Sequence, residues 1–338
     1  MKPNIHLPLT IILLTFLLLS GCGQTQNNPG NQTDWALALH GGAGTISPDM
    51  PDSLKQQYYD GLRQALRVGE IILREGGSAL DAVEAVVRNL EDNPLFNAGH
   101  GSVFTSEGKH ELDAAIMDGS TLAAGALTGL TTVKNPVSLA RIVMEESPHI
   151  FFSGSGAEEF ASQTGVERVD NDYFHTDSRY IQWRRTQPDN AFQYHEEWLE
   201  GDKFGTVGAV ALDAGGRLAA ATSTGGMTNK RFGRVGDVPI IGSGTFANHL
   251  VAISATGWGE QIMRNVSANT IANYMEFRNT SVDDAMNYVL TERLNPGDAG
   301  FVAVDRKGNI SMQMNTLGMY RGSINSRGEH VVMIWETE

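Results

Sequence analysis

Apolar residues recur at helical spacing in two successive segments near the start of the chain. In residues 52–75 they are Leu54, Tyr58, Leu62, Leu66, Ile71 and Ile72, and in residues 79–90 they are Leu80, Val83, Val86, Val87 and Leu90. This period places the apolar side chains of each segment on one face, so it predicts two amphipathic helices. Ser78 is a candidate N-cap of the second helix, with Asp81 three residues later. We expect further helices over residues 138–146 and 156–163.

The second half of the chain has a β pattern. Residues 207–213 and 218–224 are short apolar runs separated by the letters AGGR, which is typical of a hairpin. The same reasoning predicts a hairpin between residues 301–305 and 310–315, around Lys307 and Gly308. Further strands are expected at residues 35–39, 240–242 and 250–256, and further helices at residues 259–277 and 282–294, the last with Ser281 as its N-cap.

The order of these elements predicts an α+β fold. Helices and strands alternate in blocks, and the strands are joined by hairpins rather than by βαβ crossovers. Residues 170–203 interrupt the pattern, because they are polar and show no clear period. So long a loop is usually either functional or disordered, and we expect residues 170–205 to form a surface linker that leads into the active centre.

The first residues have the character of a leader. Residues 7–19 are almost wholly apolar but too short to span a bilayer as a stable helix. They end in the letters LSGC, which resemble a bacterial lipoprotein processing box with Cys22 as the lipidated residue. An ordinary secretory signal is the alternative. We therefore expect a signal peptide at 1–21, a flexible tether at 22–34 and a lipid-anchored protein on the periplasmic side of the bacterial cell envelope.

Composition and the absence of certain motifs argue against several classes of partner and binding site. Cys22 is the single cysteine, so an intrachain disulfide is impossible. The net charge is −14 and no Lys/Arg-rich run occurs, which makes nucleic acid an unexpected partner. The sequence contains no CxxC or HExxH metal motif, and no GxGxxG motif opens a helix after a strand.

Thr206 is the strongest candidate for chemistry. It follows Gly205 and the long polar segment, and it opens an apolar run. A threonine hydroxyl needs a base, and an N-terminal threonine supplies its own α-amino group. Thr206 can become N-terminal only if the bond between Gly205 and Thr206 is cleaved. The alternative is an ordinary β-branched residue at a strand start.

Thr224 is expected to face Thr206. Both residues lie nine positions from Gly215, the centre of the predicted hairpin. Residues paired in this way have Cβ atoms about 5 Å apart, so the two hydroxyl groups can form a hydrogen bond. Thr–Thr pairs are also common as ordinary neighbours in sheets.

Two glycine-rich segments could bind a substrate. Arg234 and Asp237 flank Val235 and Gly236, and together they suit the α-carboxylate and α-amino groups of an amino acid; a local salt bridge is the alternative. Thr256 and Gly257 precede Trp258 and Gly259 where a strand runs into a helix. Free backbone N–H groups there could form an oxyanion hole, although the segment could also be a plain strand-to-helix turn.

In combination, these motifs resemble the plant-type asparaginases, or isoaspartyl peptidases, of the N-terminal-nucleophile hydrolases. The resemblance extends over nearly all of residues 35–320 and includes HGGAG at 40–44, PLFNAG at 94–99, ELDA at 111–114, GTVGAVA at 205–211, TSTGG at 222–226 and GRVGD at 233–237. Two departures are Phe204, where the family commonly has histidine, and the glycine-rich letters PGDAG at 296–300.

The resemblance implies a role for each matching residue. Thr206 would be the nucleophile and base, supported by Thr224, and Thr256 and Gly257 would form the oxyanion hole. The binding set would comprise Arg234, Val235, Gly236, Asp237, Thr256, Gly257, Trp258 and Gly259. A structural sodium ion would be bound by backbone carbonyls of Leu90, Glu91, Asn93, Phe96, Ala98 and His100.

The resemblance also implies an architecture and an activity. The fold would be a four-layer αββα sandwich, cut into residues 35–205 and 206–338 of one domain and assembled as a dimer of cleaved αβ heterodimers. The substrates would be asparagine and β-aspartyl dipeptides, with no catalytic cofactor. Two alternatives stay open, a glycosylasparaginase-like amidase and an uncleaved lipid-anchored binding protein.

Overall fold

The computed structural model describes residues 34–187 and 205–336. The expected signal peptide, Cys22 and the expected tether up to residue 33 lie outside the described residues. Within the part that is described, no helix combines the length and the apolar character needed to cross a membrane.

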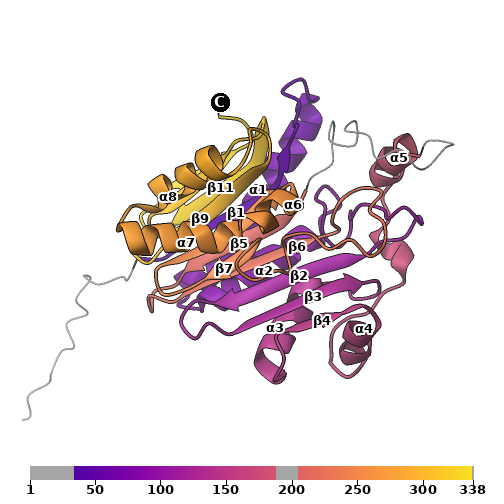
Figure 1. Ribbon diagram of the computed structural model, residues 1–338, viewed down its shortest axis with the longest axis horizontal. Helices are drawn as coiled ribbons and strands as arrows, with labels where there is room; N and C mark the ends of the chain where they lie inside the picture. Colours follow the sequence, from indigo (N-terminus) through magenta and orange to yellow (C-terminus); the bar gives the residue numbers. More distant parts are fainter. Residues whose placement is uncertain (1–33, 188–204, 337–338) are drawn as a thin grey trace, which may run out of the picture. The chain divides into compact units, whose positions relative to one another are not determined.

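Two sheets form the centre of the molecule (Figure 1). The larger has the strand order β12 (His330–Met333), β11 (Gly318–Asn325), β1 (Ala36–Gly44), β5 (Val207–Leu212), β6 (Leu218–Thr224), β2 (Leu112–Asp118), β3 (Ala124–Leu130) and β4 (Phe151–Ser153). The smaller has the order β10 (Ile310–Met314), β9 (Ala299–Asp305), β8 (Val251–Gly257) and β7 (Thr245–Ala247). Neighbouring strands are antiparallel except for β3 and β4.

Helices cover the outer face of each sheet. α1 (Asp52–Arg74), α2 (Ala79–Glu91) and α3 (Pro136–Glu146) pack on the larger sheet, whereas α7 (Ser267–Arg278) and α8 (Val282–Tyr288) pack on the smaller one. Along β1, Leu37 and Leu39 point into the core under the helices, while Ala36 and Ala38 point into the core between the sheets. This alternation is the two-residue period of a strand. The result confirms the α+β fold, with helix, sheet, sheet and helix layers.

Several predicted elements are confirmed with small changes of boundary. α1 and α2 match the two amphipathic segments, and the Ser78 hydroxyl caps α2 by accepting a hydrogen bond from Asp81 N at 3.1 Å. The two predicted hairpins are the pairs β5–β6 and β9–β10. The helix predicted at residues 156–163 is α4 (Gly154–Ser162).

Other predictions about elements were wrong. Residues 240–242 form no strand and only an isolated bridge at Ile241, and the edge strand is β7, further along the chain. The helix expected over 259–277 is two helices, α6 (Gly259–Arg264) and α7, because Val266 between them has a left-handed φ of 45°. The expected helix at 282–294 is α8 followed by a π-helical turn, η3 (Val289–Arg293).

The first part of the predicted linker is folded. It contains a 3-10 turn, η1 (Asn171–Phe174), and a helix, α5 (Asp177–Arg185). α5 buries no residue fully and is strongly polar, so an apolar period could not reveal it. The Thr176 hydroxyl caps α5 by accepting from Arg179 N at 3.3 Å.

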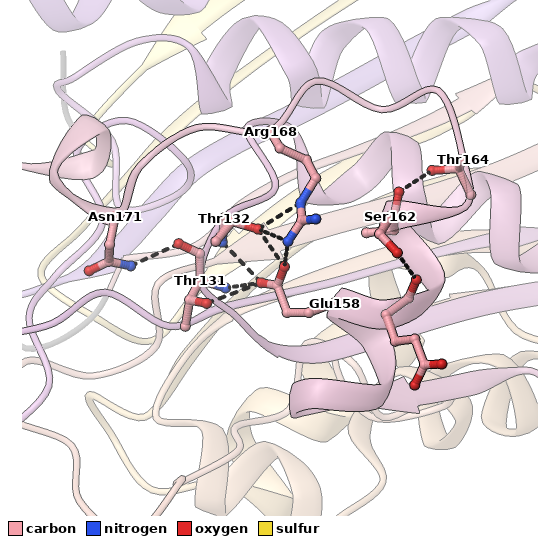
Figure 2. A network of polar contacts seen from close by, with 9 residues as sticks. Thr131, Thr132, Glu158, Ser162, Thr164, Arg168 and Asn171 are labelled. Atoms are coloured by element: carbon pink, nitrogen blue, oxygen red, sulfur yellow. Dashed lines mark hydrogen bonds and ion pairs between the residues drawn. The ribbon is translucent and has the colours of Figure 1, made fainter.

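A polar network attaches this segment to the larger sheet (Figure 2). The Glu158 carboxylate, on α4, accepts hydrogen bonds from the backbone N–H groups of Thr131 and Thr132 at 2.6 and 3.0 Å. Arg168 donates to the same carboxylate at 3.0 Å, and the Asn171 side chain donates to Thr131 O at 2.9 Å. The start of the predicted linker is thereby fixed to the turn that follows β3.

Candidate active site

Thr206 and Thr224 face each other at one end of the β5–β6 hairpin. Thr206 directly precedes β5 and Thr224 is the last residue of β6. The strand register pairs Val207 with Ser223, so the next residues outward come opposite each other. Their Oγ1 atoms lie 3.2 Å apart, and both residues are buried. The pairing predicted from the centre of the hairpin is confirmed.

The direction of each proton follows from the partners of Thr224. Its single hydroxyl proton is donated to the carbonyl oxygen of Gly205 at 3.0 Å. Its Oγ1 then accepts from the Thr206 hydroxyl and, at 2.9 Å, from Gly226 N. Thr224 is therefore placed to receive a proton from Thr206 and to give one to the carbonyl next to it.

Asn97 provides a second donor to the same carbonyl. Its Nδ2 lies 2.7 Å from Gly205 O and 2.7 Å from Gly226 O, and its Oδ1 accepts from Val103 N at 2.9 Å. These three bonds fix the orientation of the amide group. Asn97 was not predicted as a site residue, because a neutral side chain within a glycine-rich loop carries no charge pattern.

Arg234 forms its salt bridge with Glu260 and not with Asp237. Its Nε and Nη2 donate to the two carboxylate oxygens of Glu260, both at 2.9 Å. Glu260 thus occupies one edge of the guanidinium group. A guanidinium group has five N–H donors, so the edge formed by Nη1 and Nη2 is still suited to a second carboxylate.

Asp237 is a buried carboxyl group near this guanidinium. Burial raises its pKa to about 7, and Arg234 lowers it only in part. Its Oδ2 is buried and has no hydrogen-bond partner among the described residues. Because an unpaired buried carboxylate is unfavourable, this group is suited to a cationic ligand.

The end of β8 carries the predicted oxyanion residues. Gly257 has φ +131°, and a Cβ atom there would lie 2.2 Å from Asp298 O, so only glycine fits without rearrangement. Thr256 is fully buried, and its Oγ1 accepts from Ala43 N at 3.2 Å. This contact leaves the hydroxyl proton of Thr256 available for another acceptor.

The remaining predicted binding residues support these groups. The Trp258 N–H group is bonded to Asp298 O at 2.7 Å, and a Cβ atom on Gly259 would lie 2.8 Å from both Arg234 Nη2 and Asp237 Oδ1. Val235 is half-buried. Gly259 therefore keeps room for the two charged side chains, whereas Trp258 and Val235 show no direct contribution to the cavity.

One small cavity of about 10 Å³ brings the central residues together. It is lined by Gly205, Thr206, Thr224, Gly226, Met227, Arg234, Gly236, Asp237 and Gly257. Gly226 and Met227 were not predicted. In the intact chain, the backbone of Gly205 lies at this cavity, so a carbonyl group is already held next to the Thr206 hydroxyl. No group of three or more His, Cys, Asp or Glu side chains in the described part of the chain could hold a metal ion.

Comparison with known proteins agrees with this geometry. A sequence model of a family described as asparaginase matches residues 33–334. The chain belongs to this asparaginase family. Its members need no cofactor for catalysis.

Relatives of this asparaginase-family chain come from distant organisms. The isoaspartyl peptidase of Escherichia coli is 48% identical over 293 residues, which cover 84% of this chain and 91% of the relative. The plant-type L-asparaginase of Thermococcus kodakarensis is 42% identical over 301 residues, covering 84% and 94%. The isoaspartyl peptidase/L-asparaginase of Danio rerio is 41% identical over 287 residues, covering 84% and 90%.

Proposed function

We propose that this protein is a self-cleaving threonine amidohydrolase. It would remove β-aspartyl residues from isoaspartyl dipeptides and hydrolyse L-asparagine to L-aspartate and ammonia. One observation carries the proposal: the Thr206 hydroxyl, the Thr224 hydroxyl and the Gly205 carbonyl form one hydrogen-bonded unit. The family membership and the names of the relatives support the substrate class.

Self-cleavage is proposed as the first reaction. Thr206 Oγ1 attacks the carbonyl carbon of Gly205 while its proton passes to Thr224. The developing oxyanion accepts hydrogen bonds from Thr224 Oγ1 and Asn97 Nδ2. The bond from the carbonyl carbon to the Thr206 nitrogen then breaks as this nitrogen takes the proton that Thr224 received, which leaves an ester and frees the α-amino group of Thr206. Water hydrolyses this ester, so Gly205 gains a carboxylate and Thr206 regains its hydroxyl group.

The freed Thr206 would then act on substrate. Its α-amino group, with an ordinary pKa of about 7.7–8, takes the hydroxyl proton as Oγ1 attacks the β-carbonyl carbon. The oxyanion would be stabilised by Gly257 N–H and the Thr256 hydroxyl. The leaving amine takes the proton, and water hydrolyses the resulting β-aspartyl ester.

The charged groups explain why β-linked substrates are expected. Asparagine and β-aspartyl dipeptides both present a free α-carboxylate and a free α-amino group beside the scissile amide. The free edge of the Arg234 guanidinium suits the carboxylate, and the unpaired Asp237 carboxyl group suits the ammonium. Holding both groups orients the β-carbonyl toward Thr206. In an α-linked peptide, the carboxylate that Arg234 needs is consumed in the peptide bond.

A structural sodium ion at the end of α2 and in the loop that follows it remains a proposal. Carbonyl oxygens of this loop converge, because a Cβ atom on Gly101 would lie 2.5 Å from Pro94 O and 2.7 Å from Phe96 O. Hard cations take such oxygen ligands. The ion would be held by backbone carbonyls of Leu90, Glu91, Asn93, Phe96, Ala98 and His100. It would stiffen the loop that carries Asn97.

Location and assembly are also proposals. The LSGC letters support lipidation of Cys22 and anchoring on the periplasmic side of the envelope. Fractionation of cells should then find the protein with membranes and a Cys22→Ser variant outside the membrane fraction; a wild-type protein without lipid would contradict the anchor. A dimer of cleaved αβ heterodimers should elute with the corresponding mass in light scattering, and a single heterodimer would contradict it.

The activity can be tested with three substrates on the purified protein. We expect release of ammonia from asparagine and of leucine from β-Asp-Leu, and no cleavage of α-Asp-Leu. Equal cleavage of the two Asp-Leu isomers would contradict the substrate assignment. A protein that stays in one piece and hydrolyses none of them would instead favour a binding function.

A further inference from the structure

His40 connects the candidate nucleophile to the space between the two sheets. It lies on β1 beside a bulge between His40 and Gly42, and its side chain is fully buried. Its Nδ1 lies 2.9 Å from the backbone carbonyl oxygen of Thr206, and its Nε2 lies 2.8 Å from Ser254 Oγ on β8. The imidazole therefore bridges the two sheets directly behind Thr206.

Hydroxyl groups continue this contact across the layer. Ser254 Oγ lies 2.8 Å from Thr222 Oγ1, which in turn lies 2.7 Å from Thr245 Oγ1. All three residues are buried. A Cβ atom on Gly208 would come 2.0 Å from Ser254 Oγ and 2.5 Å from His40 Nε2, so the glycine leaves the room that this chain of bonds needs.

The chain of bonds can run in only one direction from His40. Burial lowers the pKa of His40 to about 3, so the ring is neutral and carries one N–H group. A carbonyl oxygen can only accept, so that N–H group is on Nδ1 and points to Thr206 O. Nε2 must then accept from Ser254, which leaves Ser254 Oγ to accept from Thr222 and Thr222 Oγ1 to accept from Thr245.

Thr206 depends on this contact once the chain is cut. The pairing of β5 with β6 begins at Val207, and its pairing with β1 begins at Gly208. After cleavage the residue loses its covalent link to Gly205. Among the described residues, the side-chain bonds that hold it are then those to Thr224 Oγ1 and His40 Nδ1.

We propose that His40 is a positioning residue that holds the carbonyl group of the new N-terminal Thr206, with Ser254 fixing its tautomer. The inference rests on the proposed role of Thr206 as nucleophile. Because His40 lies behind Thr206 and contacts neither Arg234 nor Asp237, its loss should lower kcat and leave KM nearly unchanged. Self-cleavage should continue, since the intact backbone still positions Thr206 during that step.

Two substitutions test the contacts of the two ring nitrogens of His40 separately. In His40→Asn, the side-chain nitrogen can take the place of Nδ1 and still donate to Thr206 O, although the contact with Ser254 is lost. In His40→Gln, the longer side chain can reach Ser254 but has no donor at the Nδ1 position. We expect His40→Gln to lower kcat by about 10–100-fold and His40→Asn by less than about fivefold, with KM within about twofold for both.

His110→Gln is a matched control. His110 is also buried, and its Nδ1 lies 3.2 Å from the carbonyl oxygen of Val103. A purely structural effect of removing a buried histidine should appear there as a lower Tm with kcat unchanged. In His40→Gln, kcat should instead fall by more than the loss of stability, measured as the change in Tm, can account for.

Each outcome is decisive for the role of His40. A folded His40→Gln protein with the wild-type kcat, or one that fails to cleave itself, would overturn the proposal. So would His40→Asn and His40→Gln proteins that lose kcat equally. If His40→Gln does not fold, Ser254→Ala decides, with an expected fall in kcat of about three- to tenfold at unchanged KM; an unchanged kcat would overturn the proposal. An inactive wild-type protein would contradict the proposed function itself.

Discussion

Asp237→Asn should make the protein more stable at neutral pH while removing its activity. Asp237 is buried, and its Oδ2 has no hydrogen-bond partner within residues 34–187 and 205–336. Burial raises its pKa from 3.8 to about 7. Arg234 offsets this only in part, and its guanidinium group is already paired with Glu260 at 2.9 Å. Wild-type protein therefore contains a poorly compensated carboxylate, which asparagine replaces by a neutral group of the same shape.

The stability difference between Asp237→Asn and wild type, and its pH dependence, follow from the pKa of Asp237 in the unfolded and in the folded chain. A pKa of 3.8 in the unfolded chain and about 7 in the folded one corresponds to about 4 kcal/mol. The folded state holds the proton more tightly, so the stabilising effect of the protonated form is complete below pH 3.8 and is lost as the pH rises through about 7. The advantage of Asp237→Asn should therefore grow between about pH 4 and pH 7.

Unfolding by urea at pH 4, 6 and 8 can measure this difference. Both proteins should carry Thr206→Ala, so that each remains one chain and unfolds without dissociation. We expect similar stability at pH 4 and a gain approaching about 4 kcal/mol for Asp237→Asn at pH 8. In the cleavable background, the variant should lose affinity for asparagine. An equal stability at pH 8, or a difference that does not change with pH, would show that the Asp237 carboxylate does not destabilise the folded protein.

Two further substitutions test the other groups of the site. Asn97→Ala removes one of two donors to Gly205 O, so self-cleavage should slow by about 10²–10³-fold, as followed on gels over time; an unchanged rate would remove Asn97 from the reaction. Arg234→Lys keeps the charge but loses the planar fork, so kcat/KM for β-Asp-Leu should fall by about 10–100-fold while self-cleavage continues. An unchanged kcat/KM in this variant would place the carboxylate elsewhere.

Parts of the fold follow from local patterns in the sequence. The apolar period of α1 and α2 and the Ser78 cap are properties of short segments, so they could be predicted. The pairing of Thr206 with Thr224 also follows from counting residues on both sides of one turn. In each case the relevant neighbours are close in sequence.

Other features depend on contacts between distant segments. Asn97 reaches Gly205 only because the loop after α2 packs beside the start of β5, and His40 reaches Ser254 only because β1 and β8 pack face to face. The pairing of Arg234 with Glu260 joins a loop to the first turn of α6, and no spacing rule indicates it. The break at Val266 was missed because apolar periodicity does not detect a single left-handed residue.

Self-cleavage between Gly205 and Thr206 would make Thr206 the N-terminal nucleophile. The most direct measurement is N-terminal sequencing and mass spectrometry of active wild-type protein, beside Thr206→Ala assayed in parallel. We expect two fragments, one ending at Gly205 and one beginning Thr-Val-Gly, and a Thr206→Ala protein that is intact and inactive. An active wild-type protein that remains a single chain, a cut at another bond, or an active Thr206→Ala protein would contradict this role of Thr206.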